Sequence, residues 1–258
     1  MNKVTKNFKK YRFLLGELVK KDIKLKYRSS YLGILWTLIE PILTTFVLTL
    51  IFSKLLGRAE KAFPVYILTG RLLYTFFANS TKSAMKSIRS NSAMIKKVYV
   101  PKYIYPFSTI LSNYIIFLIS LIVLFFASIV FKIIPTFYLV QIIIPLVLLL
   151  VLSLGCGMIL ATMAVFFRDL EYLWSVVLML VMYTSSIFYH VEDLDMGDMA
   201  WVFNLNPLYL IIVNFRNAVF GRPMDNSALL LSIIYSFGSL AIGLFIFYKK
   251  QDKFILNI

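Results

Sequence analysis

Long apolar stretches separated by short polar connections dominate the chain. Five of them supply the roughly 20 mainly apolar residues that a bilayer-spanning helix requires. These five stretches cover residues 31–52, 107–131, 139–167, 171–189 and 228–248. A sixth stretch, at 64–79, is strongly apolar over a shorter length and is interrupted by Arg71. The pattern therefore predicts five spans directly and leaves the sixth to be decided by charge.

Basic residues gather in two places that border these stretches. The 1–30 tail is strongly basic, and so is 82–102, which holds Lys and Arg residues and no acid. Cytoplasmic segments of membrane proteins carry an excess of Lys and Arg, so both segments are expected in the cytoplasm. An even number of spans must then separate them, which makes 64–79 a second span.

The same alternation assigns the rest of the chain. It predicts an all-α polytopic membrane protein in which 31–248 form one domain of six transmembrane helices. The 1–30 and 249–258 tails are expected in the cytoplasm together with a loop at 82–106. The 190–227 segment is expected outside, and its excess of acids agrees with that side. These acids are Glu192, Asp193, Asp195, Asp198 and Asp225.

Part of the external segment is apolar but too short to span. Asn206 and Pro207 form a plausible N-cap and first-turn pair for a helix that begins there. Irregular backbone is costly when exposed to lipid, so the segment is expected to be a re-entrant or surface-lying hairpin sheltered by protein.

The tail before the first span has the pattern of an amphipathic helix. Apolar residues fall on one side at helical spacing and lysines fall on the other. Such a helix lies in the membrane interface. It serves either as a lipid anchor alone or as a docking surface for a cytoplasmic partner. Its apolar side includes Leu15, Leu18, Val19 and Ile23.

Composition supports the membrane assignment and leaves little room for catalysis. Hydrophobic residues make up 60% of the chain, and the mean hydropathy is +0.82. The net charge of +15 fits cytoplasmic flanks better than nucleic-acid binding. Cys156 is expected to pack within a span, and His190 has no second His or Cys near it. No catalytic residues, metal site or cofactor site are expected in this chain.

Two ionisable residues fall within the predicted spans. Such residues are functional candidates because a charge in the bilayer is costly. Glu40 and Arg71 lie in neighbouring antiparallel spans, where they could pair. Arg71 is interpreted either as a gating or substrate-contacting residue, or as a structural ion pair or a side chain that reaches toward the interface.

Four segments together resemble the ABC-2 type permease subunits that export lipid-linked polysaccharides such as O-antigen, capsule or teichoic acid. They occur in the family's order, and the resemblance covers nearly the whole chain. One departure is Gly70-Arg71, where the family usually keeps an apolar stretch after the glycine. The segments are DIKLKYRSSYLGILW at 22–36 followed by Pro41, NSAMIKKVYVPKYIYP at 91–106, FRDL at 167–170, and LNP at 205–207 with Arg216.

The resemblance implies a homodimer in the bacterial plasma (inner) membrane, with two copies of a separate ATP-hydrolysing subunit below it. ATP and Mg would bind that partner, and the sequence agrees because none of its glycines opens a GxxxxGK[ST] phosphate loop. The basic segment before Pro101 is expected either to couple the two subunits or to be a solvated loop attracted to lipid headgroups. The coupling candidates are Asn91, Met94, Ile95, Lys96, Lys97, Tyr99 and Pro101.

The transported glycan would need a polar path, and aromatic rings stack on sugar faces. The tyrosines nearest the predicted cytoplasmic entrance are Tyr27, Tyr31, Tyr74, Tyr103 and Tyr105, and they join Glu40 and Arg71 as candidates for the path. Two alternatives stay open: an ABC-2 permease for a drug or small lipid, and a membrane-embedded enzyme that acts on polyprenyl-linked sugars.

Overall fold

The computed structural model describes residues 3–28, 30–55, 62–97, 100–191 and 201–257 of the chain. Within these ranges all regular secondary structure is helical. Short 3-10 turns lie at Gly33–Leu35, Phe137–Ile142 and Gln251–Lys253. The α-helices are α1 (Lys3–Tyr27), α2 (Trp36–Leu55), α3 (Phe63–Ser90), α4 (Ser92–Lys97), α5 (Ile104–Val130), α6 (Ile143–Phe166), α7 (Leu170–Tyr183), α8 (Trp201–Asn204), α9 (Pro207–Val219), α10 (Asn226–Lys250) and α11 (Phe254–Asn257).

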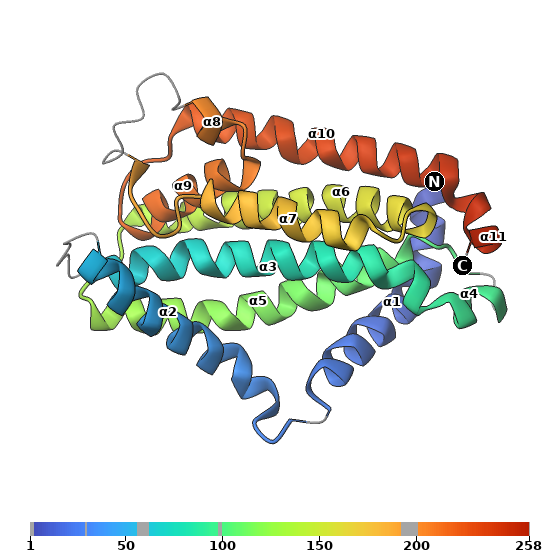
Figure 1. The fold of residues 1–258 in the computed structure, drawn as a ribbon, viewed down its shortest axis with the longest axis horizontal. Helices are drawn as coiled ribbons and strands as arrows, with labels where there is room; N and C mark the ends of the chain where they lie inside the picture. The colour runs from blue at the N-terminus through green and yellow to red at the C-terminus, as the bar shows by residue number, and fades with distance from the viewer. Residues whose placement is uncertain (1–2, 29, 56–61, 98–99, 192–200, 258) are drawn as a thin grey trace.

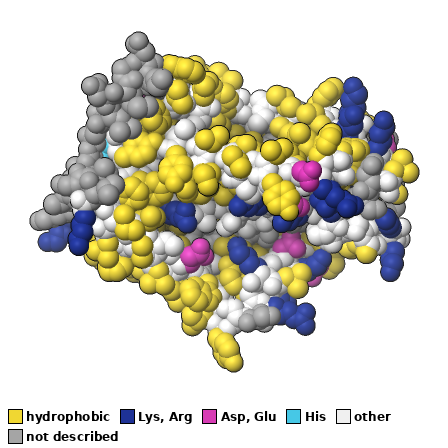
Figure 2. All heavy atoms as spheres, viewed as in Figure 1, with side chains coloured by type: hydrophobic (Ala, Val, Ile, Leu, Met, Phe, Trp, Pro, Cys, Tyr) yellow, Lys and Arg dark blue, Asp and Glu magenta, His cyan; other side chains and the backbone are white. Residues whose placement is uncertain are grey.

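Four long helices, α3, α5, α6 and α10, lie side by side along the long axis of the molecule (Figure 1). Helices α1 and α2 diverge from this bundle and meet in a V. The start of α1, α4 and α11 lie at one end, which we call the basic end, and α8 and α9 lie at the opposite end. Figure 2 shows Lys and Arg side chains gathered at the basic end and hydrophobic side chains over much of the rest of this face.

Helices α6 and α10 approach each other closely at two glycines. A Cβ atom built on Gly155 would lie 2.5 Å from the backbone nitrogen of Leu240. A Cβ atom on Gly243 would lie 2.5 Å from the carbonyl oxygen of Gly155. Small residues at such positions let two helix backbones approach, which is how membrane helices gain packing energy without a hydrophobic drive from water.

A cluster of buried side chains holds the basic end together. Leu18 of α1, Ile88 of α3 and Ile95 of α4 pack there with residues of α5, α6 and α10. Phe254 of α11 is fully buried in the same cluster. The short helix α4 is therefore fixed to the bundle, although it stands outside the long helices.

The structure contains four helical segments that are long and apolar enough to cross a membrane, among the residues described: Gly33–Lys54, Ile104–Val130, Phe137–Phe166 and Asn226–Leu256. These correspond to four of the six predicted spans. The chain is thus all-helical and multi-pass, whereas the number of six spans remains a prediction.

The other two predicted spans differ in length from their helices. The predicted span 64–79 is the first part of α3, which has 28 residues and continues through Ser90. Residues 82–90, expected in a loop, therefore belong to this helix. The predicted span 171–189 overlaps α7, which has 14 residues, begins at Leu170 and ends at Tyr183. Thr184 is the C-cap of this helix, and the chain turns at Ser186, which has a positive φ of 52°.

The segment predicted to be re-entrant lies at the end opposite the basic end. Asn206 is the N-cap of α9, as predicted, and its side chain accepts a hydrogen bond from the backbone N–H of Leu208 at 3.0 Å. The Asn206 amide also donates to the hydroxyl groups of Thr184 and Ser185, both at 2.9 Å. The chain enters and leaves this segment at the same end of the bundle. The acids predicted at 192–198 lie outside the described residues.

Candidate functional site

Helix α3 has one open face, and that face is polar. Most of its other positions are buried against the bundle, and no large hydrophobic side chain is exposed anywhere along this fully described helix. At 100° per residue, six polar positions that are not buried fall within a sector of about 80°. We call them the polar face of α3: Arg71, Thr75, Asn79, Lys82, Lys86 and Arg89.

This face contrasts with the other long helices. The outward sides of α2, α5 and α10 carry exposed side chains such as Phe46, Phe125 and Phe237. Those sides suit lipid, because a hydrocarbon solvent accepts apolar groups. Polar and charged groups of a membrane helix instead face a bundle interior or a water-filled cavity. From Arg71 to Lys86 the polar face runs about 22 Å at a rise of 1.5 Å per residue, most of the thickness of a hydrocarbon core.

A pocket of about 120 Å³ lies beside the part of the polar face farther from the basic end. It is formed between α3, α5, α2 and the end of α1, and it brings together three of the predicted path residues, Tyr27, Glu40 and Arg71. Burial raises the pKa of the Tyr27 phenol, and the neighbouring Glu40 carboxylate raises it further. Among the contacts of the described residues, Glu40 and Arg71 share this pocket but form no ion pair with each other.

The pocket's chemistry suits a hydroxylated ligand. Asn79 and Asn113 contribute amides, Thr37, Thr44, Thr75 and Ser120 contribute hydroxyl groups, and Trp36 contributes an aromatic ring. Amides, hydroxyls and a carboxylate can hydrogen-bond sugar hydroxyls, while aromatic rings cover the apolar sugar faces.

The remaining predicted path tyrosines lie elsewhere. Tyr31 is fully exposed in the connection between α1 and α2. The Tyr74 hydroxyl donates to the carbonyl of Leu178 in α7 at 3.0 Å, so it ties two helices together. Tyr103 and Tyr105 pack in the cluster at the basic end, and Tyr105 is fully buried. The structure therefore does not bring these four residues to the pocket.

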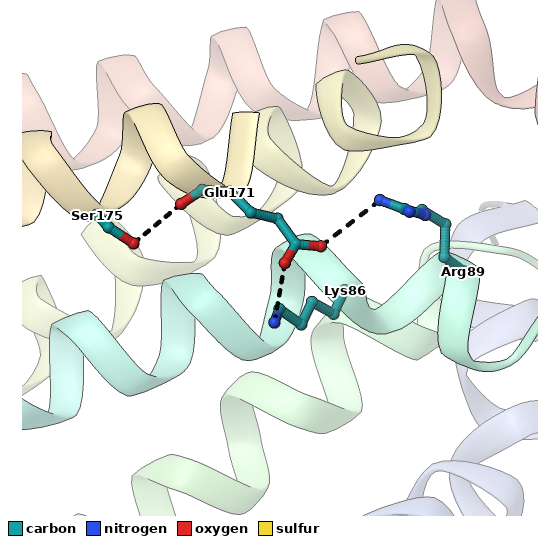
Figure 3. Close-up of polar contacts among 4 residues, drawn as sticks. All are labelled: Lys86, Arg89, Glu171 and Ser175. Carbon is teal, nitrogen blue, oxygen red and sulfur yellow. Dashed lines mark hydrogen bonds and ion pairs between the residues drawn. The ribbon is translucent and has the colours of Figure 1, made fainter. Parts of the chain in front are cut away.

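At its basic end the polar face meets α7 through one carboxylate (Figure 3). Glu171, in the first turn of α7, lies 2.9 Å from Lys86 Nζ and 3.5 Å from Arg89 Nη1. The side chains of Lys86, Arg89 and Glu171 are 58%, 32% and 32% exposed, respectively. A shallow pocket of about 390 Å³ adjoins Lys86 and Glu171 and is also lined by Lys82.

The predicted coupling residues lie on or beside α4. Asn91 caps the end of α3 and accepts a hydrogen bond from Lys21 of α1 at 3.3 Å. Ile95 is buried in the cluster at the basic end, with Met94 packed against it. The lysines at positions 96 and 97 are exposed. The helix is thus anchored on one side and presents two cations on the other.

Two further coupling candidates lie just beyond α4. The ring of Pro101 is half-buried, and its carbonyl accepts the backbone N–H of Ile104 at 3.1 Å, near the start of α5. Tyr99 lies outside the described residues.

The predicted amphipathic helix is present as α1, with 25 residues. Leu18 and Val19 of its predicted apolar side are buried, Leu15 packs against the cluster at the basic end, and Ile23 is half-buried. Burial raises the pKa of Asp22 on the same helix, an effect that the charge of Lys21 partly offsets. Part of the apolar side therefore packs on protein. Its placement in a membrane interface remains a prediction.

Arg216 holds α9 to α3. It is 6% exposed, and its guanidinium lies 3.5 Å from the centre of the Tyr66 ring. It donates to the Tyr66 carbonyl, the Thr69 hydroxyl and the Ser186 hydroxyl at 3.2, 3.3 and 3.4 Å. A Cβ atom on Gly70 would lie 2.7 Å from Arg216 Nη2, so the glycine of Gly70-Arg71 leaves room for this side chain.

The sequence interpretation did not identify the polar face or Glu171. The signal was present, because polar residues at 71, 75, 79, 82 and 86 recur every three or four positions. A span that ends at residue 79, followed by a loop, hides this signal because it separates Lys82 and Lys86 from the helix. The contact between Glu171 and α3 had no sequence signal, because it depends on how α7 folds back.

Comparisons of the sequence with known proteins show a family and several relatives. The profile of the ABC-2 type transporter family matches residues 14–220. The chain is similar to the O-antigen export system permease protein RfbA of Klebsiella pneumoniae, with 29% identity over 245 residues and 93% of each chain covered. It is also similar to the polysialic acid transport protein KpsM of Escherichia coli, with 22% identity over 97% of this chain and 98% of that protein.

Proposed function

This chain belongs to the ABC-2 type transporter family, and on that basis we propose that it is the membrane-spanning permease subunit of an ATP-driven exporter of lipid-linked polysaccharide. The names of its relatives favour O-antigen or capsule-type glycans over a drug or small lipid. Teichoic-acid-type glycans share the same chemistry and remain within the proposal. The substrate would be taken from the cytoplasmic side and moved across the bacterial plasma membrane.

The polar face of α3 is the observation that carries this proposal. A long glycan cannot partition into hydrocarbon, so its carrier must offer a polar surface through most of the bilayer. The face supplies hydrogen-bonding and charged groups from Arg71 to Lys86 along one helix. The adjoining pocket adds Tyr27 and Glu40 to this surface.

A second copy of the chain would complete the path. One subunit leaves the polar face open along one side, flanked by α2 and α7, both of which contact α3. Both neighbours carry exposed apolar residues, such as Leu43 and Leu173. Two subunits facing each other would enclose the polar faces and bury part of this apolar surface. We therefore propose a homodimer.

ATP hydrolysis is assigned to a separate partner, with two copies below the dimer that bind ATP and Mg. Force from such a partner must enter through a rigid element at the cytoplasmic side. Helix α4 meets that need, because Ile95 anchors it in the bundle and it follows α3 directly. The exposed Lys96 and Lys97 are the proposed contact with the partner. Both termini and the basic end would then be cytoplasmic.

The coupling assignment can be tested with the purified complex of permease and ATPase subunits. We expect Lys96→Glu with Lys97→Glu to weaken complex assembly at least tenfold, because charge reversal places repulsion at the contact. The matched control reverses Lys249 and Lys250, an adjacent pair in the last turn of α10 at the same end. Equal assembly and ATP turnover in wild type and the Lys96/Lys97 variant would remove the assignment.

The function itself is tested by deleting the gene and locating the lipid-linked glycan. Accumulation inside the cell, reversed by the wild-type chain, is the expected result. Normal surface display in the deletion strain would refute the export function. Labelling of single cysteines placed at Lys20 and Lys97 in intact cells would test the orientation, since both positions should be inaccessible from outside.

A further inference from the structure

Glu171 occupies a position that suits a bound anion. Its two carboxylate oxygens engage different cations, with Oε2 toward Lys86 and Oε1 toward Arg89 (Figure 3). The two cations come from successive turns of α3, and the carboxylate comes from α7. A single acidic group thus bridges two positive side chains that would otherwise stand together at the end of the polar face.

The charges around this bridge do not balance. Lys82 lies one turn along the polar face and lines the same pocket, and it has no ion-pair partner among the described residues. Three cations therefore lie beside one carboxylate, which pairs with only two of them. Ser83 and Ser175 add hydroxyl groups to the pocket wall, and Tyr172 adds an aromatic ring. The site has room and charge for an anion with more than one negative charge.

The bridge itself is weak enough to exchange. Lys86 is more than half exposed, and ion pairs between exposed side chains contribute little to stability, because water screens the charges. A phosphate or diphosphate carries more charge than a carboxylate and offers more acceptor oxygens, so it forms stronger charge-assisted hydrogen bonds with Lys and Arg. Such a ligand can displace Glu171 from Lys86 and Arg89.

We propose that Lys82, Lys86 and Arg89 bind the phosphate or diphosphate group of the lipid-linked substrate, and that Glu171 holds this site closed until the substrate displaces it. The assignment rests on the proposed export function. It adds the chemical group that is recognised and the residues that recognise it. A phosphate group near the basic end would leave the glycan free to follow the polar face toward Arg71.

Displacement would loosen only the start of α7. Two other contacts keep α7 on α3: Trp174 Nε1 donates to Thr81 Oγ1 at 3.1 Å, and Tyr74 Oη donates to the carbonyl of Leu178 at 3.0 Å. Glu171 lies one turn before Trp174. Substrate binding is therefore expected to free the first turn of α7, next to α3 and its connection to α4, without detaching the helix.

The test measures binding of a polyprenyl diphosphate bearing one sugar to the permease–ATPase complex in phosphatidylcholine nanodiscs. Lys82→Gln is expected to raise the Kd about tenfold, the equivalent of about 1.4 kcal/mol. Glu171→Gln is expected to lower the Kd about threefold to tenfold, because it removes the internal competitor. Lys249→Gln, which removes one cation at the same end from α10, should leave the Kd unchanged.

Competition experiments identify the source of the phosphate group. Inorganic diphosphate should compete weakly in wild type and more strongly in Glu171→Gln. Phosphatidylglycerol, included in the nanodisc, should compete far less well than the lipid-linked sugar. Equal competition by phosphatidylglycerol would assign the site to general phospholipid headgroups and overturn the assignment to substrate.

A Kd that is insensitive to both Lys82→Gln and Glu171→Gln would also overturn the inference. The glycan-export experiment separates this failure from failure of the proposed function. If the deletion strain retains the glycan inside and the Kd is insensitive to both substitutions, only the phosphate site is wrong. If the glycan reaches the surface without this chain, the export function falls as well.

Discussion

Substituting Gly243 by alanine tests the contact that holds α10 to α6. The added Cβ would lie 2.5 Å from the carbonyl oxygen of Gly155 and 3.2 Å from Met158 Cβ. The first neighbour is backbone, which cannot rotate away as a side chain can. The two helices must therefore separate or tilt to accept a single methyl group.

The magnitude follows from two opposing effects. Overpacking a well-packed interior costs about 1–3 kcal/mol, and the upper part of this range applies because a helix backbone must move. Replacing glycine by alanine in a helix returns up to about 1 kcal/mol of propensity. The free energy of unfolding should therefore fall by about 2 kcal/mol. Since 1 kcal/mol shifts the Tm of a chain of this size by about 2–4 °C, the Tm should fall by about 4–8 °C.

Gly238 provides the matched control on the same helix. A Cβ atom there meets nothing within 4 Å, so Gly238→Ala should keep only the propensity gain and leave the Tm unchanged or slightly higher. The assay is thermal unfolding of the purified protein in one detergent, followed by loss of the monodisperse peak. If Gly243→Ala is as stable as Gly238→Ala, the close approach of α6 and α10 is not a source of stability and the reasoning fails.

Two further predictions concern the end opposite the basic end. Asp225 caps α10 by accepting hydrogen bonds from Ser227 and Ala228, so Asp225→Ala should cost about 1 kcal/mol in thermal unfolding. The hydrogen bond from the Ser227 hydroxyl lowers the pKa of Asp225. The charged cap therefore stabilises the protein at pH values above the ordinary carboxyl pKa of 3.8. This stabilisation is lost as the pH falls through the lowered pKa of Asp225. Asp225→Ala should therefore match wild type at the acid end of a pH series, and a constant difference would contradict the assignment. Arg216 has only neutral hydrogen-bond partners among the described residues. Arg216→Lys keeps a buried charge but loses the planar stack on Tyr66, so it should lower the free energy of unfolding by about 2 kcal/mol. Arg216→Met removes the buried charge as well, so it should lower the free energy of unfolding by less. The reverse order in unfolding assays would point to an acidic partner for this guanidinium.

Several elements of the fold were predictable from the sequence. Hydropathy located the four segments that are long and apolar enough to cross a membrane, because each carries its own signal over about 20 residues. The pair Asn206 and Pro207 predicted the start of α9, because a cap is a local contact within three residues. The amphipathic pattern predicted α1, and the family motifs led to the class of transporter before any tertiary contact was considered.

The candidate site was predictable only in part. Glu40 and Arg71 were identified as costly charges within spans, and they do line one pocket with Tyr27. Tyr103 and Tyr105 were chosen by their nearness to the entrance, yet both pack into the cluster at the basic end. A tyrosine has both an apolar ring and a polar hydroxyl, so it can pack in a membrane protein or line a polar path. Its position in the sequence does not distinguish these two roles.

Single stretches of the chain carry information that is local and additive: which stretches suit lipid, which flanks are basic, where a helix is capped and which family the chain belongs to. Three other features exist only once the helices are packed: the side of α3 that stays open, the contact of Gly155 with Gly243, and the bridge from Glu171 to Lys86 and Arg89. These features depend on the relative rotation and depth of helices far apart in the chain. That arrangement is set by packing summed over many side chains, and no single stretch of sequence carries it.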